Sequence, residues 1–138
     1  MKLYSNSSTA DVDRLPATGR QTMKQVQHFK RSEMQFSTYG GPPGKAEISR
    51  LVGPELSATM GVGLARFDDC SIEWTVLYDE MVVVLEGEFR LRLSDRLIVA
   101  VPGDVIWIPQ NTPLRYEGKA ALVCYALYPV DWRARHNL

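Results

Sequence analysis

The sequence predicts an all-β fold, a sandwich or barrel of short strands, on three observations. Apolar or alternating runs of strand length recur about every 8–12 residues, and Gly and Pro turns separate them. No stretch of about 10–15 residues shows the 3.6-residue period of an amphipathic helix. Because open sheet edges promote aggregation, we expect the strands to close into a jelly-roll barrel whose subunits pair.

The predicted elements divide the chain into an arm, a barrel and a tail. Residues 1–23 are polar without a sustained period and are expected to form an N-terminal arm. The barrel domain covers residues 24–132, and residues 133–138 form a C-terminal tail; the end of the chain forms either one helical turn or irregular structure. Besides the central stretch described next, strands are expected at residues 24–29, 33–39, 46–52, 58–67, 88–93, 96–101, 105–108, 114–117 and 120–128.

The barrel is organised around residues 72–88, which the sequence predicts to be two adjoining strands. The apolar run at residues 81–85 is rich in β-branched valine and is typical of a buried strand. Gly87, between two glutamates, provides the backbone freedom that a tight hairpin turn requires. Ionisable side chains are dense at the junction of the two strands: Glu73, Tyr78, Asp79 and Glu80.

The composition excludes several classes of partner. The 138 residues are 45% hydrophobic and 23% charged, which is typical of one globular domain. The 16 basic and 16 acidic residues cancel, which argues against nucleic-acid binding. No apolar run approaches the ~20 residues that span a bilayer, and the N-terminus lacks a secretory signal. We therefore expect no nucleic-acid or membrane partner and a cytoplasmic location, in which Cys70 and Cys124 stay reduced.

Two segments resemble the paired motifs of the cupin superfamily. Glu80, followed by six residues and then Gly87, is similar to the end of the first cupin motif. Gly103, followed by five residues and then Pro109, is similar to the start of the second. The resemblance covers about residues 24–130 and implies a double-stranded β-helix, the cupin jelly-roll barrel, with a pocket inside it.

This chain departs from the metal-binding cupins that it resembles. The positions of the two first-motif histidines hold other residues, depending on the gap: Glu73 and Thr75, or Trp74 and Val76. The histidine position of the second motif falls on Leu114, so only Glu80 remains of the usual three histidines and one carboxylate. Because a transition metal needs imidazole nitrogens in such a site, the sequence predicts no metal site.

Within the cupins, the chain resembles the ethanolamine-utilisation EutQ family. The shared features are Trp74–Thr75, Tyr78–Asp79–Glu80, the VLEGE segment, Gly61–Val62–Gly63, and Tyr128–Pro129 followed by Trp132. The resemblance implies a cupin domain without the histidine triad, a role in ethanolamine breakdown and association with its bacterial microcompartments, and an acetate kinase activity. Longer members carry an additional N-terminal region, for which 138 residues are expected to leave no room.

The candidate site is centred on Glu80, which the cupin resemblance directs into the barrel. Tyr78 shares its strand face, whereas Asp79 points outward unless a bulge intervenes. Glu73 is a candidate to reach back towards Glu80 across the hairpin. Burial beside a second carboxylate raises the pKa of a glutamate, which suits general acid–base catalysis, and Tyr78 is a candidate proton donor or relay.

Two further residues complete the candidate site. Arg66 either pairs with Glu80 and joins two strands, or binds a carboxylate or phosphate of the ligand through its guanidinium. Trp74 is expected in the core or in the wall of the pocket. The set of candidate substrate-binding residues is therefore Glu73, Trp74, Asp79 and Arg66, beside the candidate catalytic residues Glu80 and Tyr78.

Three functions follow from these residues and remain open. The first is a small-molecule-binding cupin of ethanolamine or related amine catabolism that acts as a homodimer. The second is an enzyme in which Glu80 is the general acid or base for a small polar substrate, such as an acyl phosphate. It needs no cofactor, unless phosphoryl transfer requires Mg²⁺ held by Glu73, Asp79 and Glu80. The third is a structural or assembly module whose barrel is filled by side chains.

Overall fold

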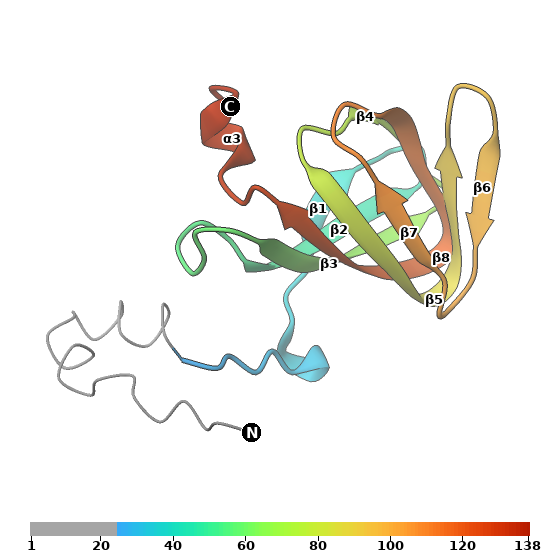
Figure 1. Ribbon diagram of the computed structural model, residues 1–138. Helices are drawn as coiled ribbons and strands as arrows, with labels where there is room; N and C mark the ends of the chain where they lie inside the picture. The colour runs from blue at the N-terminus through green and yellow to red at the C-terminus, as the bar shows by residue number, and fades with distance from the viewer. Residues whose placement is uncertain (1–24) are drawn as a thin grey trace, which may run out of the picture.

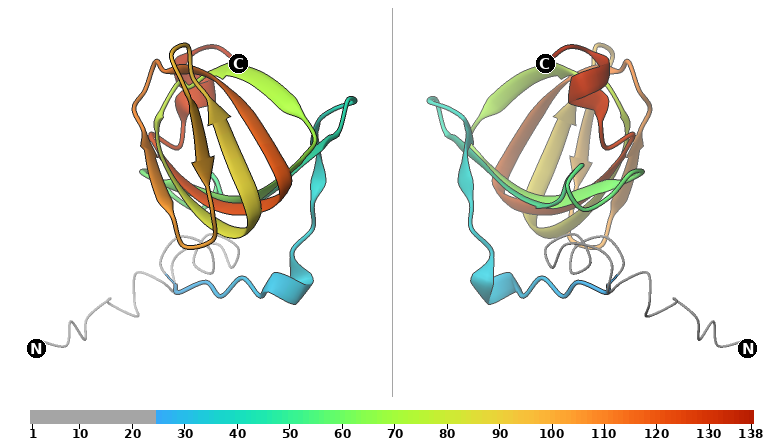
Figure 2. Two further views of the ribbon diagram at one scale, coloured as in Figure 1. Left: turned by 90° about the vertical axis from the view of Figure 1, so that its right-hand side faces the viewer. Right: turned by 90° about the vertical axis from the view of Figure 1, so that its left-hand side faces the viewer.

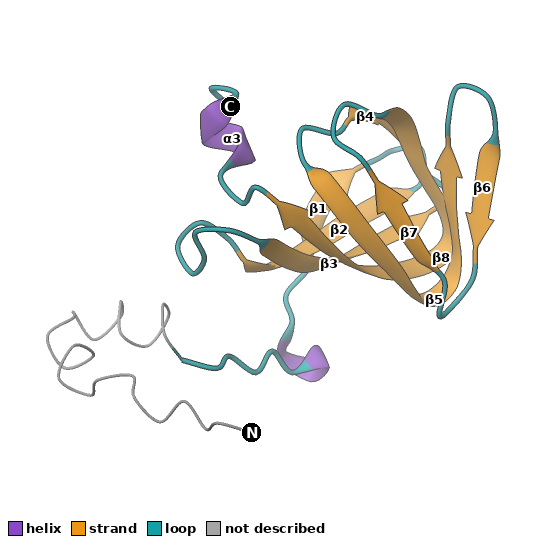
Figure 3. Ribbon diagram, in the orientation of Figure 1, coloured by secondary structure: helices purple, strands orange, loops and turns teal. Residues whose placement is uncertain are grey.

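The computed structural model describes residues 25–138, and nearly all its regular structure is β (Figure 3). The strands are β1 (Ser37–Gly40), β2 (Lys45–Val52), β3 (Gly61–Asp68), β4 (Ser71–Thr75), β5 (Asp79–Arg92), β6 (Leu97–Ala100), β7 (Val105–Ile108) and β8 (Pro113–Tyr128). Within the described range, the helical elements are the 3₁₀ turn η1 (Arg31–Glu33) and the single turn α3 (Trp132–Arg135). The arm expected at residues 1–23 lies outside this range.

The predicted all-β jelly-roll barrel is confirmed, and two long strands hold it together (Figure 1). β8 pairs with β5 along almost its whole length. The second half of β8 also pairs with β3, and its first half with β4. β5 pairs with β7 through its first half and with β6 through its second. One wall therefore has the strand order β1-β2-β3-β8-β5-β7 and the other β4-β8-β5-β6, and together they form the ring in Figure 2.

The hairpin predicted at Gly87 is wrong, and so is the division of residues 114–128 into two strands. β5 continues through Gly87 and β8 through Gly118, and the register between the two strands shifts between Val84 and Glu88. Gly87 has a φ of +68°, and a side chain there would collide with the carbonyl oxygen of Ala120. A bulge needs the same left-handed backbone as a hairpin, so the glycine signal alone does not separate them.

The N-terminal part of the barrel also differs from the prediction. Residues 25–30 form no strand, and the strand expected at residues 33–39 is shortened to β1. The side chain of Phe36 lies between two guanidinium groups, 5.0 Å from that of Arg66 and 5.4 Å from that of Arg31. These distances allow cation–π contacts, which lie on the outside of the barrel. The sequence analysis instead expected Arg66 to face Glu80 or the ligand.

Large apolar side chains fill one end of the barrel. Phe67 lies 5.5 Å from both Phe89 and Tyr116, measured between ring centroids, and the latter two rings are 6.2 Å apart. Phe89 is fully buried, and Leu91 beside it is 2% exposed. Towards the opposite end of the barrel, the inward residues of β3 are small: Gly61, Gly63 and Ala65. They leave space inside that end.

Candidate functional site

A cavity of about 670 Å³ occupies the other end of the barrel. Its floor is formed by the aromatic cluster of Phe67, Phe89 and Tyr116, and its mouth by α3 and residues 52–54 of the β2–β3 loop. Both of these mouth segments lie at the same end of the barrel in Figure 1, and the right-hand view of Figure 2 looks past α3 into the ring of strands. The cavity falls within the range of about 300–1,000 Å³ that is typical of small-molecule sites.

Small residues on β3 help to create this space, and the ring of Tyr125 partly fills it. Gly61 and Ala65 line the cavity directly. Gly63 lies between them on the same strand face, and the ring of Tyr125 occupies the place of its missing side chain. The glycine at residue 63 is therefore explained by contact with an aromatic ring of the neighbouring strand, an arrangement that alternate glycines in a strand allow.

Glu80 is the buried carboxyl group of the site, with 5% of its surface exposed. It belongs to the inward face of β5 together with Val82 and Val84, as strand alternation requires. The phenol of Tyr116 donates a hydrogen bond of 2.8 Å to its Oε1. Burial raises the pKa of Glu80 to about 7, because the charged form loses its water, and the Tyr116 hydrogen bond opposes this rise.

Four phenols line the same cavity, and burial keeps them protonated. It raises the pKa values of Tyr116, Tyr78 and Tyr39, and the negative charge of Glu80 is the next cause for each of them. Burial also raises the pKa of Tyr125, to about 12. Near neutral pH Glu80 is therefore divided between its two protonation states, while the neighbouring phenols remain hydrogen-bond donors.

Aromatic contacts hold α3 against the mouth of the cavity. The ring of Trp132 lies 5.0 Å from that of Tyr78 and 5.9 Å from that of Trp74. The indole Nε1 of Trp74 is buried and has no hydrogen-bond acceptor among the described residues. Because this nitrogen has almost no accessible surface, it is enclosed by protein atoms and does not open to the cavity.

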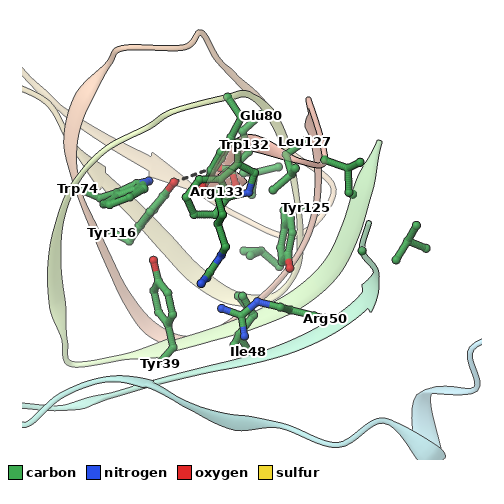
Figure 4. A pocket seen from close by; sticks show the side chains of 18 of the residues that line it. Tyr39, Ile48, Arg50, Trp74, Glu80, Tyr116, Tyr125, Leu127, Trp132 and Arg133 are labelled. Carbon is green, nitrogen blue, oxygen red and sulfur yellow. Dashed lines mark hydrogen bonds between the residues drawn. The ribbon is translucent and has the colours of Figure 1, made fainter. Parts of the chain in front are cut away.

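Two arginines enter the cavity from separate elements. Arg50 extends from β2 and Arg133 from α3, and Figure 4 shows both guanidinium groups on the side of the cavity where the hydroxyl of Tyr39 lies. Both positive charges lower the pKa of Tyr39 against the larger effects of burial and Glu80. The guanidinium of Arg133 also stacks 4.8 Å from the ring centre of Trp132.

The structure brings together three of the six residues proposed from the sequence. Glu80, Tyr78 and Trp74 line the cavity. Glu73 lies on the exposed face of β4, 3.3 Å from the guanidinium of Arg115. The predicted approach of Glu73 to Glu80 is therefore not observed, because Glu73 and Trp74 alternate and it is Trp74 that faces inward.

The other two proposed residues lie outside the cavity. The carboxylate of Asp79 accepts a hydrogen bond of 2.9 Å from the backbone N–H of Gln110, which fixes the β7–β8 loop. Arg66 belongs to the outward face of β3 and stacks on Phe36, so the predicted pairing with Glu80 is not formed. Arg50, on the neighbouring strand, occupies the inward position that the sequence analysis assigned to Arg66.

Sequence reasoning missed most of the polar lining of the cavity. The missed residues are Tyr39, Arg50, Tyr116, Tyr125 and Arg133. Tyr116 has a sequence signal, because it lies two residues after Leu114 in the same strand and therefore shares its inward face. Arg50 also shares a face with Ile48, but a charged residue at the end of a strand is more commonly exposed. Arg133 lies in a tail for which no orientation was predicted.

The donor groups of the cavity do not fit a cupin metal ion. In the described part of the chain, no three His, Cys, Asp or Glu side chains gather at one place. Glu80 has phenols rather than imidazoles around it, and its carboxylate is engaged by Tyr116. The set of Glu73, Asp79 and Glu80 considered for Mg²⁺ is also separated, since only Glu80 faces the cavity.

Comparison with known proteins assigns the chain to a family. The profile of the family described as ethanolamine utilisation protein EutQ matches residues 2–134. The chain belongs to the EutQ family. Its relatives include the acetate kinase EutQ of Salmonella typhimurium, 28% identical over 105 residues, and that of Clostridioides difficile, 25% identical over 136 residues. These matches cover 75% and 98% of this chain, and 46% and 87% of the relatives, so the chain spans about half the length of the Salmonella protein.

Solved EutQ structures have the same fold. The ethanolamine utilisation protein Q of Salmonella typhimurium matches with a TM-score of 0.68 and 28% identity, over 76% of this chain and 87% of that chain. The Clostridium difficile EutQ protein matches with a TM-score of 0.63 and 26% identity, over 69% of this chain and 70% of that chain. The cupin barrel predicted from the sequence is therefore confirmed. In residues 25–138, no helix has the length and apolar character needed to cross a membrane.

Proposed function

We propose that this EutQ-family chain binds a small molecule inside its barrel, as part of ethanolamine or related amine catabolism. The observation that carries this proposal is the cavity of about 670 Å³ around the Glu80–Tyr116 pair. An apolar cavity with a few convergent polar groups is the usual form of a ligand site. The cavity does not support the alternative of a structural module whose barrel is filled by side chains.

Ligand binding can be tested by thermal shift and calorimetry on the full chain. The probes are acetate, acetyl phosphate with Mg²⁺, ethanolamine, and larger carboxylates, amides and alcohols. A ligand that binds only the folded state raises the melting temperature. We expect Tyr116→Phe to weaken the binding of any probe that raises the melting temperature of the wild type, because this substitution removes the hydroxyl group that bonds to Glu80.

Tyr128→Phe is the matched control for this experiment. Tyr128 is 53% exposed and does not line the cavity, so the loss of its hydroxyl should leave binding unchanged. Equal effects of the two substitutions, or no binding of any probe, would contradict the proposal.

One observation favours an enzymatic alternative. Glu80 is buried without an arginine partner, and its pKa of about 7 suits a general acid or base near neutral pH. Two relatives are named acetate kinase, a phosphoryl transfer for which Mg²⁺ would have to arrive with the nucleotide, since of the two side-chain carboxyl groups in the lining Asp131 is paired with Arg135 and only Glu80 lies inside the barrel. The test is acetyl phosphate formation from ATP and acetate. Activity that survives in Glu80→Gln would exclude Glu80 as its acid or base.

We also propose the homodimer that the sequence predicts. Its support is an apolar area on the outer face of β5, β7 and β8, where Met81, Val105, Trp107 and Tyr128 are 40%, 61%, 63% and 53% exposed. Met81 and Trp107 form a cross-strand pair, and Val105 lies two residues before Trp107 on the same strand. Contiguous exposed apolar areas are typical of protein interfaces. Light scattering should give a dimer that Trp107→Glu converts to a monomer; a wild-type monomer at high concentration would refute this.

A further inference from the structure

The charge around the cavity is unevenly distributed between its mouth and its interior. Arg50 and Arg133 lie at the mouth, and neither has a carboxylate partner among the residues that the structure describes. The lining contains two carboxyl groups. Asp131 is paired with Arg135 at 2.8 Å, and Glu80 lies deeper, bonded to Tyr116. Among the side chains that the structure describes, the two guanidinium groups at the mouth are therefore left without a carboxylate partner.

The two arginines are placed to act on one group. They come from elements far apart in the sequence, β2 and α3, and their guanidinium groups lie on the same side of the cavity in Figure 4. Both act on the hydroxyl of Tyr39, which places their charges near a common point. A guanidinium presents a planar fork of donors that matches the oxygens of a carboxylate or a phosphate.

The volume and the walls of the cavity indicate the size and the polarity of the ligand. About 670 Å³ lies in the upper half of the range of roughly 300–1,000 Å³ that is typical of small-molecule sites. Acetate or ethanolamine would occupy only a small part of that space. The walls between the arginines and Glu80 are mainly hydrocarbon and aromatic, including Ile48, Val123 and Leu127. A ligand that fills the cavity therefore needs an apolar body as well as a charged group.

We infer that the ligand of this cavity is an amphiphilic organic anion. Its carboxylate or phosphate binds Arg50 and Arg133 at the mouth, and its apolar body extends into the barrel towards Glu80 and Tyr116. Polar atoms at the inner end of the ligand meet the Glu80–Tyr116 pair. This inference rests on the proposed function, because it names the class of ligand for the same cavity.

Calorimetry with three probes of one shape tests this inference on the full chain. The probes are 4-phenylbutanoate, its neutral amide, and 4-phenylbutyl phosphate, at pH 7 and low salt. We expect one or both anions to bind at least about tenfold more tightly than the amide. A preference between carboxylate and phosphate then identifies the anionic group. Higher ionic strength should weaken the binding of the anions and leave that of the amide unchanged.

Arginine variants identify the groups that bind the anion. Arg50→Gln and Arg133→Gln should each remove most of the preference for the anion, with the affinity for the amide unchanged. Arg50→Lys keeps the charge but loses the planar fork and should give an intermediate preference. Both positions are at the surface, so the fold should tolerate these changes. Arg90→Gln is the control, because Arg90 pairs with Glu88 outside the cavity.

The outcomes separate this inference from the proposed function. Equal affinities for the anions and the amide would overturn the anionic class and leave small-molecule binding intact. A preference for anions that Arg90→Gln also removes would place the binding elsewhere on the surface and overturn the inference. If neither the anions nor the amide binds, the inference and the proposed cavity function both fail.

Discussion

The two ends of the barrel are built from the same pair of long strands, yet one is packed and the other is hollow. At the packed end, the second half of β5 contributes Phe89 and Leu91, which are buried against Tyr116 of β8. At the hollow end, its first half contributes Glu80 and Val82, and the opposite strand β3 offers Gly61 and Ala65. Side chains alternate in both halves, although the inward parity changes at the bulge around Gly87, so the difference comes from side-chain size. We therefore expect the stable core at one end, and the proposed ligand site is at the other.

The largest expected effect is at the packed end. Phe89→Ala removes a fully buried ring and should lower the free energy of unfolding by about 3–5 kcal/mol, measured by denaturant unfolding. Val99→Ala, at a position 49% exposed on the outer face of β6, should change it by no more than about 0.5 kcal/mol. Similar losses for the two variants would mean that the packed end is not the stable core.

The next effect is the pH dependence caused by Glu80 at the hollow end. Its pKa of about 7 in the folded state lies above the ordinary 4.5, so the folded chain holds this proton more tightly than the unfolded chain. Stability should therefore fall as the pH rises from about 4.5 to 7, by up to about 3 kcal/mol, and Glu80→Gln should lack this fall. The phenols around Glu80 remain protonated throughout this range and do not contribute.

Glu73→Gln is the matched control for that measurement, because it removes a carboxylate whose side chain is 79% exposed. It should retain the wild-type pH dependence. A Glu80→Gln variant that loses stability over the same pH interval as the wild type would show that another group, and not Glu80, causes the fall.

A third substitution tests how the hollow end is kept open. Gly63→Ala should cost about 1–3 kcal/mol, because the new methyl group meets the ring of Tyr125 and lies 2.6 Å from the carbonyl oxygen of Ser49. Part of this loss should be recovered in the Gly63→Ala/Tyr125→Ala double variant relative to the sum of the single changes. Strictly additive effects would mean that Tyr125 does not contact residue 63 as described.

The smallest effect on stability is expected at the mouth. Trp132→Ala removes two ring contacts, to Trp74 and Tyr78, and should cost about 1–2 kcal/mol in thermal unfolding. It should also raise the rate constant of ligand release, because Trp132 holds α3 over the opening. Arg92→Ala, on the outer face of β5, is a control that should not alter release. Unchanged release from Trp132→Ala would mean that α3 does not restrict the opening.

The sequence predicted the fold well because strand alternation and turn residues are local signals. The boundaries of β2 and β7 were recovered almost residue for residue. The failure at Gly87 arises because a glycine with left-handed backbone permits a hairpin and a bulge equally. The choice depends on the partner strand, where Gly87 faces the backbone of Ala120, and that contact is not encoded locally.

The site was harder to predict than the fold because it depends on which face of each strand turns inward. For β5 the cupin resemblance fixed that face, and Glu80 and Tyr78 line the cavity. For β3 no such reference existed, and Arg66 turned out to point away from it. Arg133 depends on where a short tail folds back, which only tertiary contacts determine. The predicted and observed sites therefore differ mainly because the sequence does not show which of two alternating strand faces points into the barrel.

The central position of β8 has a consequence for how the barrel assembles. β8 is the last strand in the chain, yet it separates β3 from β5 in one wall and β4 from β5 in the other. Its pairing of Leu127 with Gly61 spans more than half of the barrel sequence. Contacts of such long range are slow to form because a large loop must close first. During synthesis, the earlier strands must wait with unpaired edges until β8 emerges, so the nascent chain is most exposed to aggregation just before its last strand is available.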